Sequence, residues 1–187
     1  GVRRMAFQHR VHRCARGGHI RMLKLGFAEA RREALAAAVQ LYAARGWTGA
    51  ANMSTSLEEA QILQDLAANS ALPLAVEVYL TPEDSPAVYE RGPYADASGL
   101  VHVRGVKLYM DGALGSRGAA LLAPYSDAPG AGLLVTPVEQ VRDFLTRARA
   151  ANVQVATHAI GDRGNRLVLD AYRDTFVDNA EALRAAR

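Results

Sequence analysis

The stretch VQVATHAIGDRGNRLVLDAY, residues 153–172, changes its secondary-structure pattern in the middle. Residues 153–157 are short, apolar and β-branched, which is typical of a buried strand, whereas the second half has the apolar spacing of a helix. His158, Gly161 and Asp162 lie at the junction. The stretch therefore predicts a β-α unit, and in parallel α/β folds the carboxyl end of the strand carries the functional groups.

The same alternation of helix and strand patterns continues outward from this unit. We expect helices at residues 27–45, 57–69, 86–89, 136–151 and from 162 onwards, and strands at residues 47–53, 72–80, 101–111 and 153–158. This order predicts right-handed β-α units around a parallel sheet, either an open doubly wound sheet or a (β/α) barrel. Since a barrel needs eight strands, a barrel with only four expected strands would be a partial one.

Composition excludes several classes of protein. No apolar run approaches roughly 18 residues, so we expect no membrane span and a cytoplasmic protein. The single cysteine, Cys14, excludes a disulfide framework and a cysteine-rich zinc site.

The formal charge is +3, but residues 1–26 hold seven basic residues and no acid, which leaves 15 basic and 19 acidic residues elsewhere. The positive charge thus belongs to one end of the chain, which argues against a nucleic-acid partner.

Residues 1–26 form a basic tail with neither helical spacing nor the apolar block of a secretory signal. His9, His12 and His19 suggest a metal site, but the neighbouring arginines would repel a cation. We interpret this tail as an unstructured or artefactual segment, and residues 27–187 as the folded domain.

The strand GVKLYMD, residues 105–111, separates apolar from polar side chains. Neighbouring side chains on a strand point to opposite faces, so one face is Val106, Leu108 and Met110, and the other is Lys107, Tyr109 and Asp111. A lysine in mid-strand must pair, lose its charge or be modified, because an unpaired buried ammonium group is costly. One interpretation pairs Lys107 with Asp111 or Glu77.

Three further residues are candidates for a site. His158 stands at the carboxyl end of its strand, where it is either a ligand or a hydrogen-bonded structural residue. Asp162 is placed either to cap the next helix or to hold the site residues in position without contacting the ligand itself. The glycine-rich loop 111–120 lacks the lysine and Ser or Thr of a phosphate-binding loop, and it fits a substrate loop in which Arg117 meets an anionic or carbonyl group.

Two stretches of the sequence together resemble the amidohydrolase superfamily: GVKLYMDGALGSRGAALLAPYSDAPGAGLL and QVATHAIGDRGNRLVLDAY. Within this superfamily they resemble amidohydrolase family 3, the exoenzyme-like and formamide-deformylase-like metal-dependent hydrolases. The resemblance covers about residues 27–187 and implies a (β/α)8 barrel with one or two divalent metal ions, usually zinc, at its C-terminal mouth. Lys107 matches the fourth-strand lysine that can be carboxylated to bridge two metal ions, and His158 matches the metal-binding histidine of the fifth strand. Arg117, with Asp111 and Tyr109, is expected on the substrate side.

The resemblance also implies ligands at positions outside this sequence. The His-x-His of the first strand would precede residue 27, and the sixth-strand histidine and eighth-strand aspartate would follow Arg187. We therefore expect the middle of a longer protein, about strands two to five, which is inactive alone. The implied reaction is hydrolysis of a carbon–nitrogen bond in a small non-peptide amide, formamide or cyclic amide by metal-activated water.

Two other interpretations stay open. In the first, the chain is a non-catalytic α/β module in which His158, Asp162 and Arg117 bind an anion at a helix N-terminus. In the second, it is a non-functional remnant of such a hydrolase, whose open strand edges lead to a homodimer or to aggregation.

Overall fold

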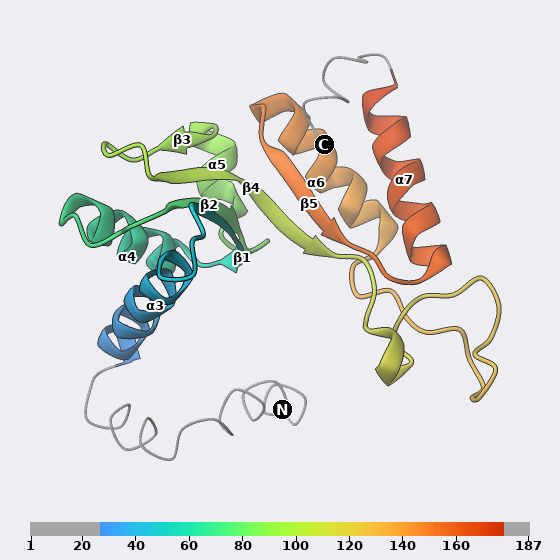
Figure 1. The fold of residues 1–187 in the computed structure, drawn as a ribbon. Coiled ribbons are helices and arrows are strands. Elements are labelled where there is room, and N and C mark those ends of the chain that lie inside the picture. The colour runs from blue at the N-terminus through green and yellow to red at the C-terminus, as the bar shows by residue number, and fades with distance from the viewer. Residues whose placement is uncertain (1–26, 178–187) are drawn as a thin grey trace.

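The computed structural model describes residues 27–177 as an α/β structure built on one largely parallel sheet (Figure 1). The helices are α3 (Phe27–Ala43), α4 (Leu57–Ala68), α5 (Ser85–Arg91), α6 (Val138–Ala151) and α7 (Asp162–Phe176). The strands are β1 (Gly49–Thr55), β2 (Ala75–Leu80), β3 (Tyr94–Ala95), β4 (Val101–Tyr109) and β5 (Gln154–His158). A short 3-10 turn, Leu114–Ser116, lies in the long loop after β4.

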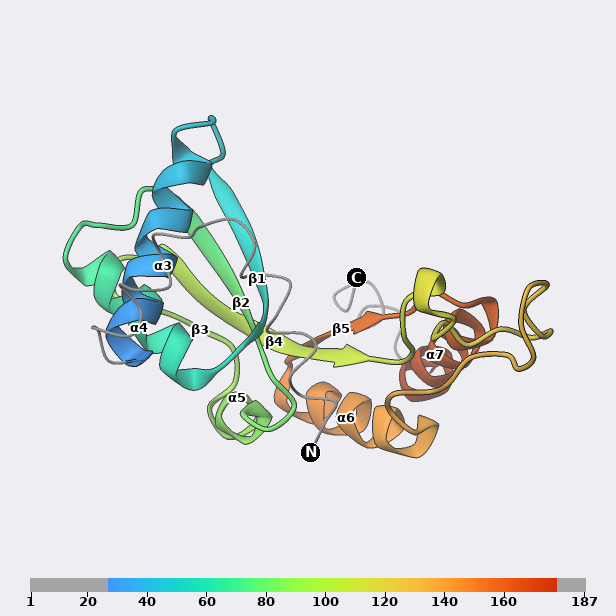
Figure 2. The ribbon, with the colours of Figure 1, turned by 90° about the horizontal axis from the view of Figure 1, so that it is seen from below.

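The sheet follows the expected β-α order. Strand β1 pairs with β2, β2 with β4 and β4 with β5, all in parallel. Figure 2 shows α3 and α4 beside β1 and β2, and α6 and α7 at the other end of the sheet, near β5. This arrangement is a partial (β/α) barrel, as the sequence predicts. Strand β3, which pairs antiparallel with the start of β4, is not predicted because two residues are too few to show alternation.

Element ends differ from the predicted ones by a few residues. Strand β1 starts at Gly49 instead of residue 47, and β2 starts at Ala75 instead of residue 72. Leu72 and Leu74 are buried although they precede β2, so an apolar run extends beyond the paired residues. Helix α4 begins after Ser56, which forms a capping box with Glu59, so Ser56 is the cap among the two serines that precede this helix.

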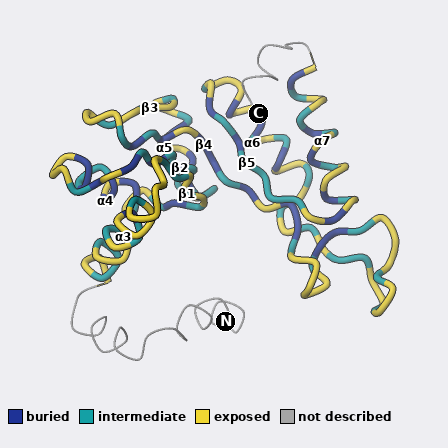
Figure 3. Tube along the Cα trace, viewed as in Figure 1, coloured by how far each residue is buried: buried dark blue, intermediate teal, exposed yellow. Residues whose placement is uncertain are grey.

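One face of the sheet supplies the core. Buried side chains alternate along β2 and β4 and belong to the core; they include Val76, Val78, Leu80, Val101, Val103, Val106 and Leu108. The register between β2 and β4 shifts after Val78, so Tyr79 pairs with Gly105, and alternation then resumes at Val106. Figure 3 shows buried residues concentrated along the strands and exposed residues on α3 and in the loops. None of the helices in residues 27–177 is long and apolar enough to cross a membrane.

The other face is lined by polar and part-exposed side chains, and we call it the open face: Glu77, Tyr79, Arg104, Lys107, Tyr109, Gln154 and His158. Hydrogen bonds cross it between strands. Arg104 binds Glu77 at 2.9 Å, and the Tyr79 hydroxyl donates to Gln154 Oε1 at 2.8 Å. Gly105 lies between Tyr79 and Gln154 in the sheet register, so this bond spans β4 and joins β2 to β5.

Candidate functional site

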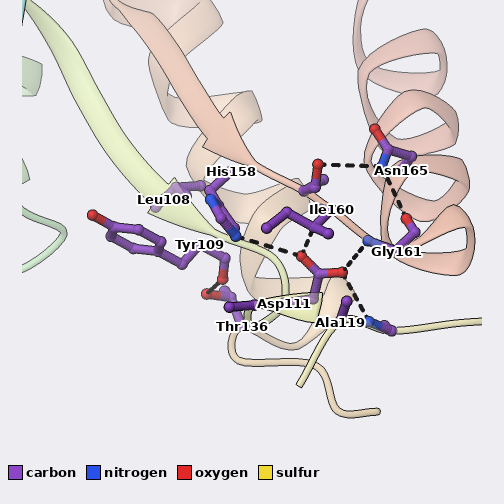
Figure 4. A network of polar contacts seen from close by, with 12 residues as sticks. Leu108, Tyr109, Asp111, Ala119, Thr136, His158, Ile160, Gly161 and Asn165 are labelled. Carbon is purple, nitrogen blue, oxygen red and sulfur yellow. Dashed lines mark hydrogen bonds and ion pairs between the residues drawn. The ribbon is translucent and has the colours of Figure 1, made fainter. Parts of the chain in front are cut away.

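Lys107, Tyr109 and His158 gather at the carboxyl ends of β4 and β5. Tyr109 is in register with His158, and Lys107 is two residues before Tyr109, so all three side chains lie on the open face. The Tyr109 and His158 ring centroids are 5.5 Å apart, and Lys107 Nζ lies 4.1 Å from the Tyr109 centroid. Figure 4 shows Tyr109 and His158 next to each other at the ends of their strands. The structure thus brings together the two residues that the sequence predicts as metal ligands.

The Lys107 amine is partly withdrawn from water. Its Nζ donates to the Leu108 carbonyl at 2.7 Å, and burial lowers the pKa of Lys107. The carboxylate of Glu77 is bound by Arg104, so the pairing of Lys107 with Glu77 is not the arrangement observed. A lowered pKa increases the neutral fraction of the amine, which is the nucleophilic form that carboxylation by carbon dioxide requires.

Asp111 anchors the turn that follows His158. Its buried carboxylate accepts backbone N–H bonds from Ile160 at 2.9 Å, Gly161 at 2.8 Å and Ala120 at 2.9 Å (Figure 4). Burial alone would raise the pKa of Asp111, but these hydrogen bonds and the nearby His158 together lower it. The side chain has no exposed surface, and a substrate contact for Asp111 stays a prediction.

Asp162 is the first residue of α7 and joins this helix to a loop. The N-cap position belongs to Gly161, and Asp162 Oδ1 accepts the Leu122 N–H at 2.8 Å. A Cβ on Gly161 would lie 1.9 Å from the Ala120 carbonyl oxygen, so glycine is required where the two segments meet. Asp162 Oδ1 also accepts the Arg163 N–H at 2.8 Å in the first turn of α7, so its role as a helix cap or as a support of the site stays a prediction.

Arg117 lies in the loop after β4. It adopts φ 55° at the end of the 3-10 turn, and its guanidinium pairs with Asp127 at 3.0 Å. Both side chains are more than half exposed, so this pair is open to exchange with a charged or polar ligand. A substrate contact for Arg117 stays a prediction.

Ser54 contacts a residue of the candidate site, and sequence analysis misses this contact. Its hydroxyl lies 2.9 Å from the Tyr109 hydroxyl, although 55 residues separate them in the chain. A serine in the run Ser-Thr-Ser before a helix indicates a helix cap, and no local pattern shows that the side chain points across the sheet.

The described residues supply only part of a metal centre. Within residues 27–177, no group of three or more His, Cys, Asp or Glu side chains lies close enough to hold a metal ion. Zinc takes three or four protein ligands. Lys107 and His158 lie on the open face at the ends of adjacent strands, and their role as two of these ligands stays a prediction.

Residues 7–186 match the amidohydrolase family. The chain belongs to the amidohydrolase family. This match includes residues 7–26, most of the segment that composition alone separates from the domain. The predicted tail lies outside the described residues, together with His9, His12, His19 and Cys14.

Curated relatives of this amidohydrolase share short stretches with it. Protein LONG AFTER FAR-RED 3 of Arabidopsis thaliana is 38% identical over 88 residues, which are 46% of this chain and 15% of that protein. The YtcJ protein of Bacillus subtilis (strain 168) is 38% identical over 81 residues, 43% of this chain and 14% of that protein.

Two solved structures match a larger share of this chain than the curated relatives do. An uncharacterized metal-dependent hydrolase from Pyrococcus horikoshii OT3 has a TM-score of 0.74 at 30% identity, over 83% of this chain and 32% of that one. An uncharacterized metal-dependent hydrolase from Pyrococcus furiosus has a TM-score of 0.74 at 29% identity, over 79% of this chain and 32% of that one. The chain therefore spans about a third or less of the length of these relatives.

Proposed function

We propose that the complete protein is a metal-dependent hydrolase of carbon–nitrogen bonds in non-peptide amides, formamides or cyclic amides. The observation that carries this proposal is the placement of Lys107 and His158 on one face, at the carboxyl ends of adjacent strands, in a chain of the amidohydrolase family. Metal-dependent hydrolases among the similar solved structures support it.

The metal site would use a carboxylated Lys107 as an oxygen ligand and the His158 imidazole as a nitrogen ligand, with zinc as the expected ion. A bound zinc ion would lower the pKa of its water to about 7 and so supply a hydroxide at neutral pH. Asp111 would hold the turn after His158 in place through its three backbone bonds. The remaining ligands would lie outside residues 27–177, so this part of the chain alone should not catalyse hydrolysis.

An anion-binding module is less well supported. Such a module needs free N–H groups at the start of α7, but the Ile160 and Gly161 N–H groups already bind the Asp111 carboxylate. The position that an external anion would occupy is thus filled by a side chain of the protein.

The test is metal analysis of the complete protein by mass spectrometry, together with turnover of a panel of formamides and cyclic amides. Lys107→Ala and His158→Ala should each lower the bound metal and reduce kcat/KM at least about tenfold, because each removes a ligand. His102→Ala is the matched control, since His102 lies near the amino end of β4 and bonds to the Gly99 carbonyl. Unchanged metal content in both site variants would refute the ligand assignment.

A further inference from the structure

A β-bulge at the end of β1 directs Ser54 away from the sheet ladder. Met53 pairs with Tyr79 and Thr55 pairs with Leu80, so Ser54 is the extra residue between two paired ones. Its φ of 58° lies in the left-handed region, which serine rarely adopts. The bulge turns Thr55 into the core, where it is 1% exposed. Bulges often re-aim a side chain next to an active site.

The re-aimed Ser54 hydroxyl meets the Tyr109 hydroxyl at 2.9 Å. Strand β2 lies between β1 and β4 in the sheet and ends at Leu80, so this contact joins β1 to β4 past the end of β2. Tyr109 is 40% exposed, and its ring contacts both Lys107 and His158. The Tyr109 ring therefore places its hydroxyl, and with it Ser54, on the same face of the sheet as Lys107 and His158.

The chemistry of the pair favours an uncharged polar ligand. Each hydroxyl has one proton and two lone pairs. When one hydroxyl donates to the other, the second keeps its proton for an outside acceptor, and lone pairs on both oxygens stay available for an outside donor. A neutral amide presents a carbonyl acceptor and an N–H donor side by side, which matches this set.

We propose that Ser54 and Tyr109 form a positioning site that holds the amide group of the substrate beside Lys107 and His158. This inference rests on the proposed function in taking an amide as the ligand. The left-handed backbone at Ser54 supports this inference. Strained residues of this kind persist where the surrounding structure fixes them, and they cluster at ligand-binding and active sites.

The binding test uses the complete protein labelled with 3-fluorotyrosine and followed by fluorine NMR. The Tyr109 signal is the one that disappears in Tyr109→Phe, and N-methylformamide is the probe. We expect a saturable shift of this signal in the unmodified protein and its loss in Ser54→Gly. Glycine adopts φ 58° freely, so this variant removes the hydroxyl without adding backbone strain. Tyr42→Phe, on α3 before the start of β1, is the control and should keep the shift.

Turnover gives a separate measurement. If the protein hydrolyses formamides, Ser54→Gly should raise KM about fivefold, the effect of losing roughly one hydrogen bond, with a smaller effect on kcat and no loss of metal. No turnover, with a saturable shift that depends on Ser54, would refute the proposed function and leave the positioning site standing. Turnover without a Tyr109 shift, or with a shift that survives in Ser54→Gly, would overturn the positioning site and leave the function standing.

Discussion

Oδ1 of Asp111 lies 3.8 Å from Nε2 of His158, and the same carboxylate binds the backbone N–H groups of Ile160 and Gly161 in the turn that follows. The carboxylate therefore fixes both the turn and the position of the imidazole at the end of β5. Because the Ala120 N–H binds it as well, Asp111 also ties the loop after β4 to the start of α7.

Asp111→Asn should lower the free energy of unfolding by about 2–4 kcal/mol, because the amide group presents N–H donors to backbone N–H groups that then lack an acceptor. Urea denaturation measures this loss. Asp127→Asn is the control, since Asp127 is exposed and pairs only at the surface with Arg117; it should change stability by less than about 1 kcal/mol. Equal stability of the two variants would contradict the anchoring role of Asp111.

Gly105→Ala should destabilise the sheet by about 3 kcal/mol, since a Cβ there would lie 2.1 Å from the Gln154 carbonyl oxygen and force β5 away from β4. Gly49→Ala is a matched strand control, because its Cβ would meet the Ala75 oxygen at 3.5 Å, an ordinary contact. Thermal unfolding of both variants tests the difference, and a similar small effect in each would show that the β4–β5 pairing is looser than the structure indicates.

Leu108→Ala should cost about 2–5 kcal/mol, because Leu108 is 1% exposed and its truncation leaves a cavity under the sheet. Leu122→Ala, at a side chain 69% exposed in the loop, should cost less than about 1 kcal/mol. Urea denaturation of the pair tests whether the Leu108 side chain belongs to the core.

Asp96 gives the turn before β4 a dependence on pH. Its carboxylate accepts the N–H groups of Ser98, Leu100 and Val101 and the Ser98 hydroxyl. Burial by itself would raise the pKa of Asp96, but the hydrogen bonds lower it. A lowered pKa in the folded state means that the stabilisation is present above about pH 4, the ordinary value for aspartate, and is lost as the pH falls further.

Asp96→Ala should therefore cost about 1–2 kcal/mol at pH 7 through its lost hydrogen bonds. The difference from the unmodified protein should shrink as the pH falls below about 4, where the native carboxylate also becomes protonated. Unfolding free energies at a series of pH values measure the difference, and a constant gap across the acid range would exclude this role.

Much of the fold follows from local pattern. Alternation along GVKLYMD places Leu108 in the core and Lys107 and Tyr109 on the other face, as observed, because adjacent side chains on a strand point to opposite faces. The same alternation does not predict that the Asp111 side chain is buried. Strand β4 ends at Tyr109, and beyond it the position of a side chain depends on the loops that fold over it.

The sequence by itself determined the β-α order, the core face of β4 and the two candidate ligands Lys107 and His158. These features depend on periodicities and motifs carried by contiguous residues. Only the tertiary structure decided that Asp111 is an anchor and that Ser54 meets Tyr109. The partners of Asp111 lie 9 to 50 residues away, and Ser54 and Tyr109 are 55 residues apart. Contacts over such separations arise from strand register and chain crossing, which no local pattern specifies.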